Sequence, residues 1–260
     1  MKLGCTTLLY GGYDLDTAIE GLKTAGFEAV ELAAIPGMGE HFKGGQPASD
    51  YAEIRAKLDE AGLYLESVGC SGALGTDRFV PLMQAAAALG APYMTLGTGG
   101  LSDDEHAWKQ MMDLTRSALP VCESTGVKLS VKPHVRAAVY SIATATRFMN
   151  ELQSEWVGLN IDNTHLQRVG DDPIAAISAL KQWIFTARIR DYDSDDYGIG
   201  SIENQIPGKG RADVRGYLQA LSTVPGLEYV VVEMVGAKEL ELKEIQRIIG
   251  ETIIALKSYQ

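Results

Sequence analysis

The feature that most constrains the fold is a regular alternation of short apolar runs with amphipathic stretches along the chain. Several runs carry Val, Ile or Leu at consecutive positions, which is typical of parallel strands buried on both faces. Between the runs, apolar residues follow the three- and four-residue spacing of a helix, as at Leu15, Ile19 and Leu22. Glycines such as Gly26 and Gly62 stand where such helices would end. The sequence therefore predicts repeated strand–helix units.

Eight such units are predicted in the 260 residues, close to the length of about 250 that a β/α barrel needs. A doubly wound sheet usually has a glycine-rich phosphate turn after its first strand, but residues 6–12 (TTLLYGG) match neither known pattern. We therefore predict an α/β fold, a single (β/α)8 TIM barrel, with residues 1–260 as one domain. The expected strands are 3–7, 29–32, 64–69, 93–97, 128–132, 157–162, 184–190 and 229–233.

Charge and cysteine content exclude several classes of function. The chain has 34 acidic and 23 basic residues, and this net charge of −11 leaves no dense basic stripe for nucleic acid. Its apolar runs are far shorter than the roughly 20 residues that cross a bilayer, so we expect no membrane partner. Three cysteines without a C-x-x-C pair argue against a disulfide scaffold and favour a reducing, cytoplasmic location.

Polar residues stand at the carboxyl ends of the predicted strands. In a barrel these ends meet at the mouth, where active sites are built. Charges there need a partner, because an unpaired buried charge is costly, although salt bridges at the edge of the mouth would also satisfy them. The long connections 33–49 and 192–212 follow strands as well, and we predict that the second forms a lid or wall of the site. These polar residues are Glu31, Lys132, His134, Asp162, His165, Arg188, Asp191 and Glu233.

The motifs at these positions resemble those of the xylose isomerase-like barrel superfamily of sugar isomerases, epimerases and related enzymes. The resemblance covers essentially the full length, and its order and spacing are more specific than any single motif. The motifs are GFEAVEL at 26–32, KPH at 132–134, DNTH at 162–165, RIRD at 188–191, PGKG at 207–210 and VE at 232–233.

This resemblance implies a divalent metal held by Glu, Asp, His and Glu from four strand ends. The metal would bind neighbouring oxygens of a keto-sugar, and two carboxylates would transfer a proton through an ene-diolate. This chain departs from the family pattern at two of the four ligands, because Lys132 replaces the first Glu and Arg188 replaces the His. Only Asp162 and Glu233 match the family's ligands.

The two substituted cations change the expected cofactor. An ammonium and a guanidinium repel a dication, so we expect no metal at the usual position and side-chain cations in its place. A shifted Mn²⁺ or Zn²⁺ site remains as an alternative, because two carboxylates and two imidazoles suit these ions. Its ligands would be Asp162, Glu233, His134 and His165.

Catalytic roles are expected for four residues. Glu233 and Asp162 are the acid–base candidates, and His165 would act as a proton shuttle or hydroxyl contact. Lys132 would donate to an enolate oxygen or, as an amine, form a Schiff base. The alternative is that Lys132, Asp162, Arg188 and Glu233 form a neutral ion-pair network with a purely structural role.

Substrate contacts are expected from five further residues. Arg188 can hold a carboxylate, a phosphate or vicinal oxygens with two parallel hydrogen bonds. His134 is placed near the pocket by the family resemblance, and Glu31 and Asp191 by their strand-end positions. Lys209 follows a glycine turn and is a candidate phosphate contact.

Three functions follow from these residues. The first is an isomerase or epimerase of a small sugar, keto-sugar or sugar acid that works through an enediolate, without the usual metal. The second is a lyase or a Schiff-base aldolase that uses Lys132. The third is a non-catalytic sugar-binding barrel. We expect a small carbohydrate as partner, with homo-oligomer formation as a further possibility.

Overall fold

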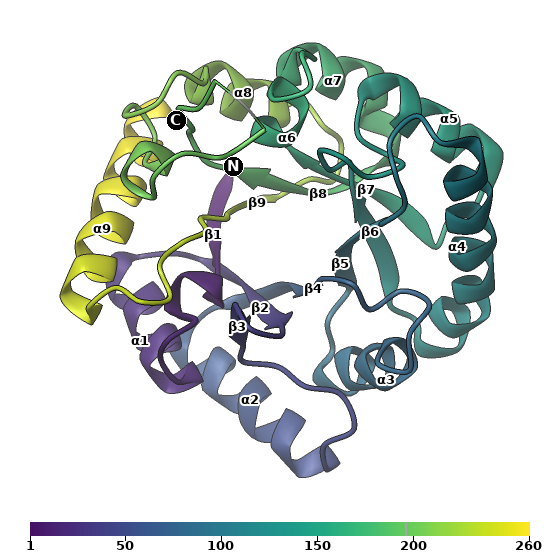
Figure 1. The fold of residues 1–260 in the computed structure, drawn as a ribbon. Coiled ribbons are helices and arrows are strands. Elements are labelled where there is room, and N and C mark those ends of the chain that lie inside the picture. Colours follow the sequence, from purple (N-terminus) through teal and green to yellow (C-terminus); the bar gives the residue numbers. More distant parts are fainter. Residues whose placement is uncertain (196) are drawn as a thin grey trace.

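The computed structural model describes residues 1–195 and 197–260, and Asp196, in the long connection 192–212, lies outside the described residues. Within them, eight parallel strands close into a barrel with helices around it (Figure 1). The order is β1-β9-β8-β7-β6-β5-β4-β2, and β1 pairs with β2 to close the ring. The strands are β1 (Lys2–Thr6), β2 (Ala29–Ile35), β4 (Tyr64–Cys70), β5 (Tyr93–Gly97), β6 (Lys128–Lys132), β7 (Val157–Asp162), β8 (Ile184–Ile189) and β9 (Tyr229–Val232).

The predicted (β/α)8 TIM barrel is therefore confirmed. A short strand β3 (Gly39–Glu40), which folds back antiparallel onto the end of β2, was not predicted. The α-helices are α1 (Leu15–Ala25), α2 (Ala48–Ala61), α3 (Phe79–Leu89), α4 (Glu105–Thr125), α5 (Ile142–Leu152), α6 (Asn163–Gln167), α7 (Pro173–Leu180), α8 (Val214–Leu221) and α9 (Leu242–Tyr259). Short 3₁₀ helices are η1 (Thr7–Tyr10), η2 (Lys181–Trp183) and η3 (Glu203–Gln205).

Local sequence explains where the helices begin and end. Asp14 accepts a hydrogen bond from the Thr17 N–H at the start of α1, which satisfies an otherwise free donor. Gly26 ends the same helix with φ of 87°, a left-handed conformation that a side chain would strain.

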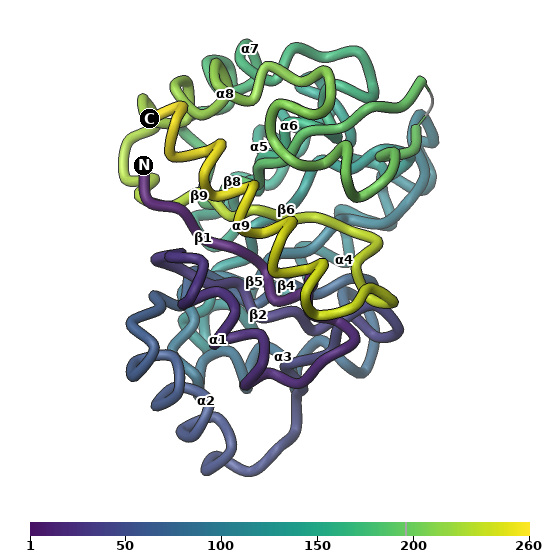
Figure 2. The backbone as a smooth tube through the Cα atoms, turned by 90° about the vertical axis from the view of Figure 1, so that its left-hand side faces the viewer, coloured from purple at the N-terminus to yellow at the C-terminus, as the bar shows by residue number. Residues whose placement is uncertain are grey.

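The two termini lie near each other (Figure 2), and the Gln260 amide donates to the Met1 carbonyl. In the described part of the chain, no helix is long and apolar enough to span a bilayer.

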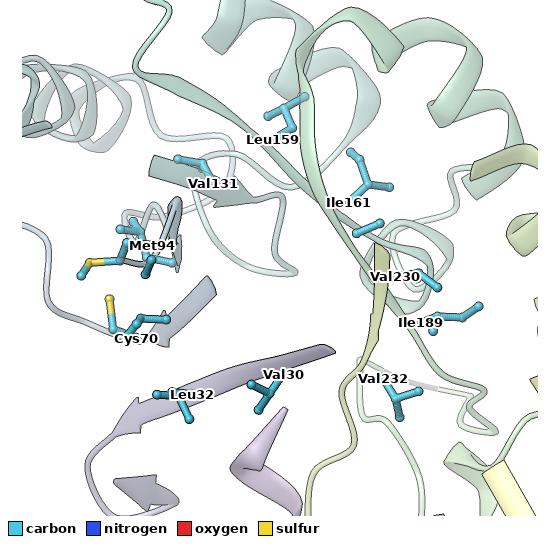
Figure 3. Close-up of a cluster of buried hydrophobic side chains, with 14 of the residues drawn as sticks. Val30, Leu32, Cys70, Met94, Val131, Leu159, Ile161, Ile189, Val230 and Val232 are labelled. Carbon is cyan, nitrogen blue, oxygen red and sulfur yellow. The ribbon is translucent and has the colours of Figure 1, made fainter. Parts of the chain in front are cut away.

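The outward faces of the strands form the hydrophobic core. Buried apolar side chains from neighbouring strands lie side by side (Figure 3). They pack against apolar residues of the surrounding helices, such as Leu22 of α1 and Ile248 of α9. The labelled strand residues in Figure 3 are Val30, Leu32, Cys70, Met94, Val131, Leu159, Ile161, Ile189, Val230 and Val232.

The inward faces of the strands are polar. Arg188 of β8 contacts Glu31 of β2 and Glu66 of β4, and because these strands are not neighbours in the sheet, the contacts cross the barrel interior. A register shift between β2 and β4 pairs Glu31 with Ser67, which leaves Glu66 as the extra residue of a bulge. Such a bulge turns a side chain that would otherwise face outward. Strands β5 to β8 carry further buried polar side chains, namely Thr95, Ser130, Asn160 and Thr186.

Candidate active site at the barrel mouth

A cavity of about 270 Å³ lies at the carboxyl ends of the strands. Residues of both predicted long connections line it, with Ile35 and Met38 from the first and Ile199 from the second. The segment 192–212 thus forms part of the wall, as expected for a mouth loop. The charged and imidazole side chains that line the cavity are Glu31, Lys132, His134, His165, Arg168, Arg190 and Glu233.

Lys132 and Glu233 form an ion pair across the mouth. The Lys132 Nζ lies 2.5 Å from Glu233 Oε2 and 3.6 Å from Asp162 Oδ2. Although burial raises the pKa of Glu233, the charges of Lys132 and Arg190 hold it below its ordinary value. Glu233 is therefore a carboxylate at neutral pH, and it keeps a partly exposed side chain that a substrate can reach.

Asp162 lies behind this pair and does not line the cavity. Its Oδ1 accepts from the N–H and the hydroxyl of Thr164, at 3.0 and 2.8 Å, as the N-cap of α6. Its Oδ2 lies 3.2 Å from Arg190 Nη2. Burial raises the pKa of Asp162, but the charges of Arg190 and Lys132 outweigh it and hold the pKa well below its usual range. The structure thus places Asp162 as a fixed anion that orients its neighbours.

Arg190 lines the cavity and was not among the site residues predicted from the sequence. Its Nη1 donates to the Glu233 carbonyl at 2.8 Å, and its Nη2 lies 3.3 Å from His165 Nε2. It lines the cavity, whereas Arg188, which was expected to hold the substrate, is fully buried beneath it. A signal was available, because residues two apart on a strand share a face, and Arg190 follows Arg188 at that spacing.

Arg188 is instead the centre of a buried ion cluster. Its Nη2 donates to Glu31, its Nη1 lies 3.3 Å from Glu66 Oε1, and its Nε lies 3.6 Å from Glu233 Oε2. Glu66 was not considered at the sequence level, and burial raises the pKa of this carboxyl group. Arg188 therefore lies between three carboxyl groups and does not itself line the cavity.

The rings of His134 and His165, which both line the cavity, lie with centroids 3.9 Å apart and planes tilted by 37°. His134 Nδ1 lies 2.8 Å from the Val135 carbonyl and donates to it, so Nε2 carries the lone pair. The Val135 N–H lies 3.4 Å from His165 Nδ1. Burial holds the pKa of His165 well below its ordinary value, which keeps this ring neutral beside Arg190.

Two predicted substrate contacts lie away from the cavity. Asp191 is fully buried and accepts hydrogen bonds from the N–H groups of Gly208, Gly210 and Ala212, at 2.8 to 3.1 Å. The Asp191 carboxylate therefore holds the backbone at the end of the 192–212 segment in place. Lys209 is exposed and pairs with Glu203 and Glu251 on the outside of the barrel. Neither residue lies among those that line the cavity.

The side chains at the family's metal position do not fit a divalent ion. Lys132 Nζ lies within 3.6 Å of both Asp162 and Glu233, the two acidic ligands that this chain retains. A dication there would meet this ammonium and the Arg188 guanidinium at short range. For the shifted site, His165 Nε2 lies 3.3 Å from the Arg190 guanidinium, whose charge repels a dication. Across residues 1–195 and 197–260, no three His, Cys, Asp or Glu side chains are grouped to hold a metal.

Comparison with known proteins agrees with this architecture. A family profile described as xylose isomerase-like TIM barrel matches residues 19–258. The chain belongs to this family. No significant match was found among curated proteins. Family membership accounts for the motifs at the mouth, since they occupy the strand ends that the profile spans.

Several solved structures share the fold over the whole chain at low sequence identity. The IOLI protein with a bound zinc atom is 19% identical with a TM-score of 0.80, covering 100% of this chain and 99% of that one. A probable 3-DHS dehydratase from Bacillus anthracis is 15% identical with a TM-score of 0.79, covering 99% of both chains. A D-psicose 3-epimerase from Clostridium cellulolyticum H10 is 14% identical with a TM-score of 0.78, covering 100% of both. At these identities the likeness establishes the fold.

Proposed function

We propose that this protein is a sugar isomerase or epimerase that moves a proton at the carbon beside a carbonyl group. Its substrate is a small sugar, keto-sugar or sugar acid, and the intermediate is an enediolate. The observation that carries the proposal is the Lys132–Glu233 pair, 2.5 Å apart and facing one cavity. An ionised carboxylate beside a fixed cation is what abstraction of such a proton requires.

Each residue of the pair has a defined task. Glu233 takes the proton from carbon, and the electron pair moves onto the carbonyl oxygen. Lys132 Nζ donates to that oxygen and stabilises its charge without a metal ion. Arg190 fixes the Glu233 backbone, while His134 and His165 supply neutral contacts for substrate hydroxyls. Removing one such oxyanion donor lowers turnover by about 10²–10³-fold in other enzymes, which sets the expected loss for Lys132→Met.

The lyase and Schiff-base alternatives require different chemistry at the same residue. Imine formation at Lys132 would first break the 2.5 Å ion pair with Glu233. Loss of a hydroxyl group after the same proton abstraction would make the protein a dehydratase-type lyase. Borohydride reduction with substrate tests the imine, since a covalent adduct on Lys132 would overturn the proton-transfer proposal.

The decisive experiment is deuterium uptake in D₂O, followed by proton NMR. The substrates are D-fructose, D-psicose, D-tagatose and the corresponding keto-sugar acids, and the protein is first dialysed against a chelator. We expect exchange at a carbon next to the carbonyl, loss of exchange from at least one of these compounds in Glu233→Gln, and no gain on adding Mn²⁺ or Zn²⁺. No exchange with any of these compounds, with or without metal, would support the non-catalytic barrel instead.

Metal content separates the two cofactor hypotheses directly. We expect wild-type protein exposed to Mn²⁺ or Zn²⁺ and then gel-filtered to retain no stoichiometric metal. The variant Lys132→Glu/Arg188→His restores the family's ligand types and, once circular dichroism shows that it is folded, should retain about one equivalent by the same assay. Stoichiometric metal in the wild type that disappears in Asp162→Ala would restore the shifted metal site.

A further inference from the structure

We propose that Glu31 is the second acid–base group of the site and works as the counterpart of Glu233. This inference rests on the proposed function and assigns a role that the family pattern does not supply. The family resemblance implies a carboxylate at the end of β6, but Lys132 stands there. A reaction that returns the proton to the other face of the substrate carbon, or to a neighbouring carbon, needs a second acid–base group. Among the described residues, Glu31 is the other carboxylate that lines the cavity.

The Glu31 carboxylate is held through one oxygen. Its Oε2 accepts from Thr95 Oγ1 at 2.5 Å and from Arg188 Nη2, and Ser67 Oγ, which also lies 2.5 Å from Glu66 Oε2, is 3.0 Å away. Among residues 1–195 and 197–260, no donor is hydrogen-bonded to Oε1. The anchored oxygen therefore fixes the group, and the other oxygen is available to a ligand.

Space for this carboxylate is built into β4. A methyl group at Gly69 would lie 2.7 Å from the Glu31 carboxyl carbon and 2.9 Å from Oε1, closer than real Cβ contacts allow. Gly69 also lines the cavity. The absence of a side chain at position 69 thus leaves room for the Glu31 carboxyl group at the cavity wall.

Glu233, like Glu31, has one carboxylate oxygen close to cations and one farther from them. Its Oε2 faces Lys132 and the Arg188 Nε, while Oε1 has its nearest cation at 3.7 Å, on Arg190. The Arg188 guanidinium therefore lies beside both carboxylates: Nη2 donates to Glu31, and Nε lies 3.6 Å from Glu233 Oε2 without a hydrogen bond. Of the two carboxylates, Glu31 is the more deeply buried and Glu233 the more exposed.

Two carboxyl groups at different depths of one cavity carry out a balanced transfer. One carboxylate takes the proton from the carbon next to the carbonyl, and the C–H electron pair forms the enediolate. The other group first takes up a proton from solvent and then gives it to carbon as the carbonyl re-forms. The proton taken from carbon thus ends on the first glutamate, and exchange with solvent restores the starting state.

The test compares Glu31→Gln and Glu233→Gln by deuterium uptake from two sugars that are epimers at C3, D-fructose and D-psicose. Each variant should slow uptake from one epimer by at least about 10²-fold and keep uptake from the other within several-fold. The two variants should affect opposite epimers. The matched control is Glu66→Gln, which also removes a carboxylate from Arg188 but does not line the cavity, and it should keep both rates.

Two results would overturn the inference while leaving the proposed function in place. One is a Glu31→Gln variant with both rates unchanged. The other is equal slowing of both epimers by Glu31→Gln and Glu66→Gln, which would make Glu31 only a counterion of Arg188. If wild-type protein exchanges neither epimer nor any other compound of the panel, the proposed function fails and this inference fails with it. Circular dichroism and thermal melts verify that each variant is folded.

Discussion

The two faces of the barrel strands differ sharply in composition. The outward face is apolar and packs against helices, as in the cluster around Ile161 and Leu159. The inward face carries small polar residues and the buried cluster of Arg188 with Glu31 and Glu66. Barrels of this kind are usually filled by bulky branched apolar residues, so this interior departs from the common pattern.

The two faces contribute to stability in different ways. Outward residues stabilise the fold by leaving water, an effect that does not depend on exact direction. Inward polar residues lose their hydrogen bonds to water and must replace them with bonds to specific partners, so their positions are tightly constrained. The buried interior of this protein is therefore connected to the cavity, because Arg188 pairs with both carboxylates that line it.

The largest expected effect is the loss of Arg188. Arg188→Met leaves Glu31 and Glu66 buried without their cation, and breaking a buried network in this way typically costs about 3–5 kcal/mol. Urea unfolding at pH 7 measures the change in free energy of unfolding. The control is Arg55→Met, which removes an exposed pair with Asp59 and should cost less than about 1 kcal/mol. Equal effects of the two variants would contradict the contrast between inside and surface.

A change on the outward face should affect stability and leave the chemistry alone. Ile161→Ala removes buried methyl groups and should cost about 2–5 kcal/mol, because a cavity remains. The folded fraction should keep its deuterium exchange rate, since the side chain packs away from the mouth. A loss of exchange comparable to that of Glu233→Gln would show that the two faces are coupled.

The pH dependence of stability tests the neutral histidine of the inward cluster. Since the pKa of His165 is held well below 6.5 by burial, the unfolded chain binds more protons below that pH, and stability falls as pH decreases. His165→Gln removes this contribution, so its unfolding free energy should fall less steeply between pH 7 and pH 5. The largest slope difference is about 1.4 kcal/mol per pH unit for one proton. Parallel curves would show that His165 is not a buried neutral group.

The smallest effect is expected at the outer surface of the 192–212 segment. Lys209 and Arg247 both pair with Glu203 and Glu251 there, and all four side chains are partly exposed. Glu203→Gln should lower stability by less than about 1 kcal/mol, and the loss should shrink at high salt. Thermal melts at low and high ionic strength measure this. A larger, salt-independent loss would place this network with the buried cluster instead.

The barrel itself was predictable from the sequence because its signals are local. Runs of buried strand residues and glycines at helix ends require only neighbouring positions, and the structure places β6 and β7 at the residues expected. The strand-end rule also found Lys132 and Glu233, since parallel strands bring their carboxyl ends to one rim. The hairpin partner β3 and the bulge at Glu66 had no comparable signal, because register is set by pairing between strands.

Only the tertiary structure decided how deeply each side chain is buried and which side chains meet across the barrel interior. Arg188 of β8 and Arg190 just after it are both buried, and only closure of the barrel decides that the second lines the cavity and the first does not. The contacts of Arg188 with Glu31 and Glu66 join residues 157 and 122 positions apart. Periodicity reports which face a residue occupies, but the partner it meets across the interior depends on how all eight strands close.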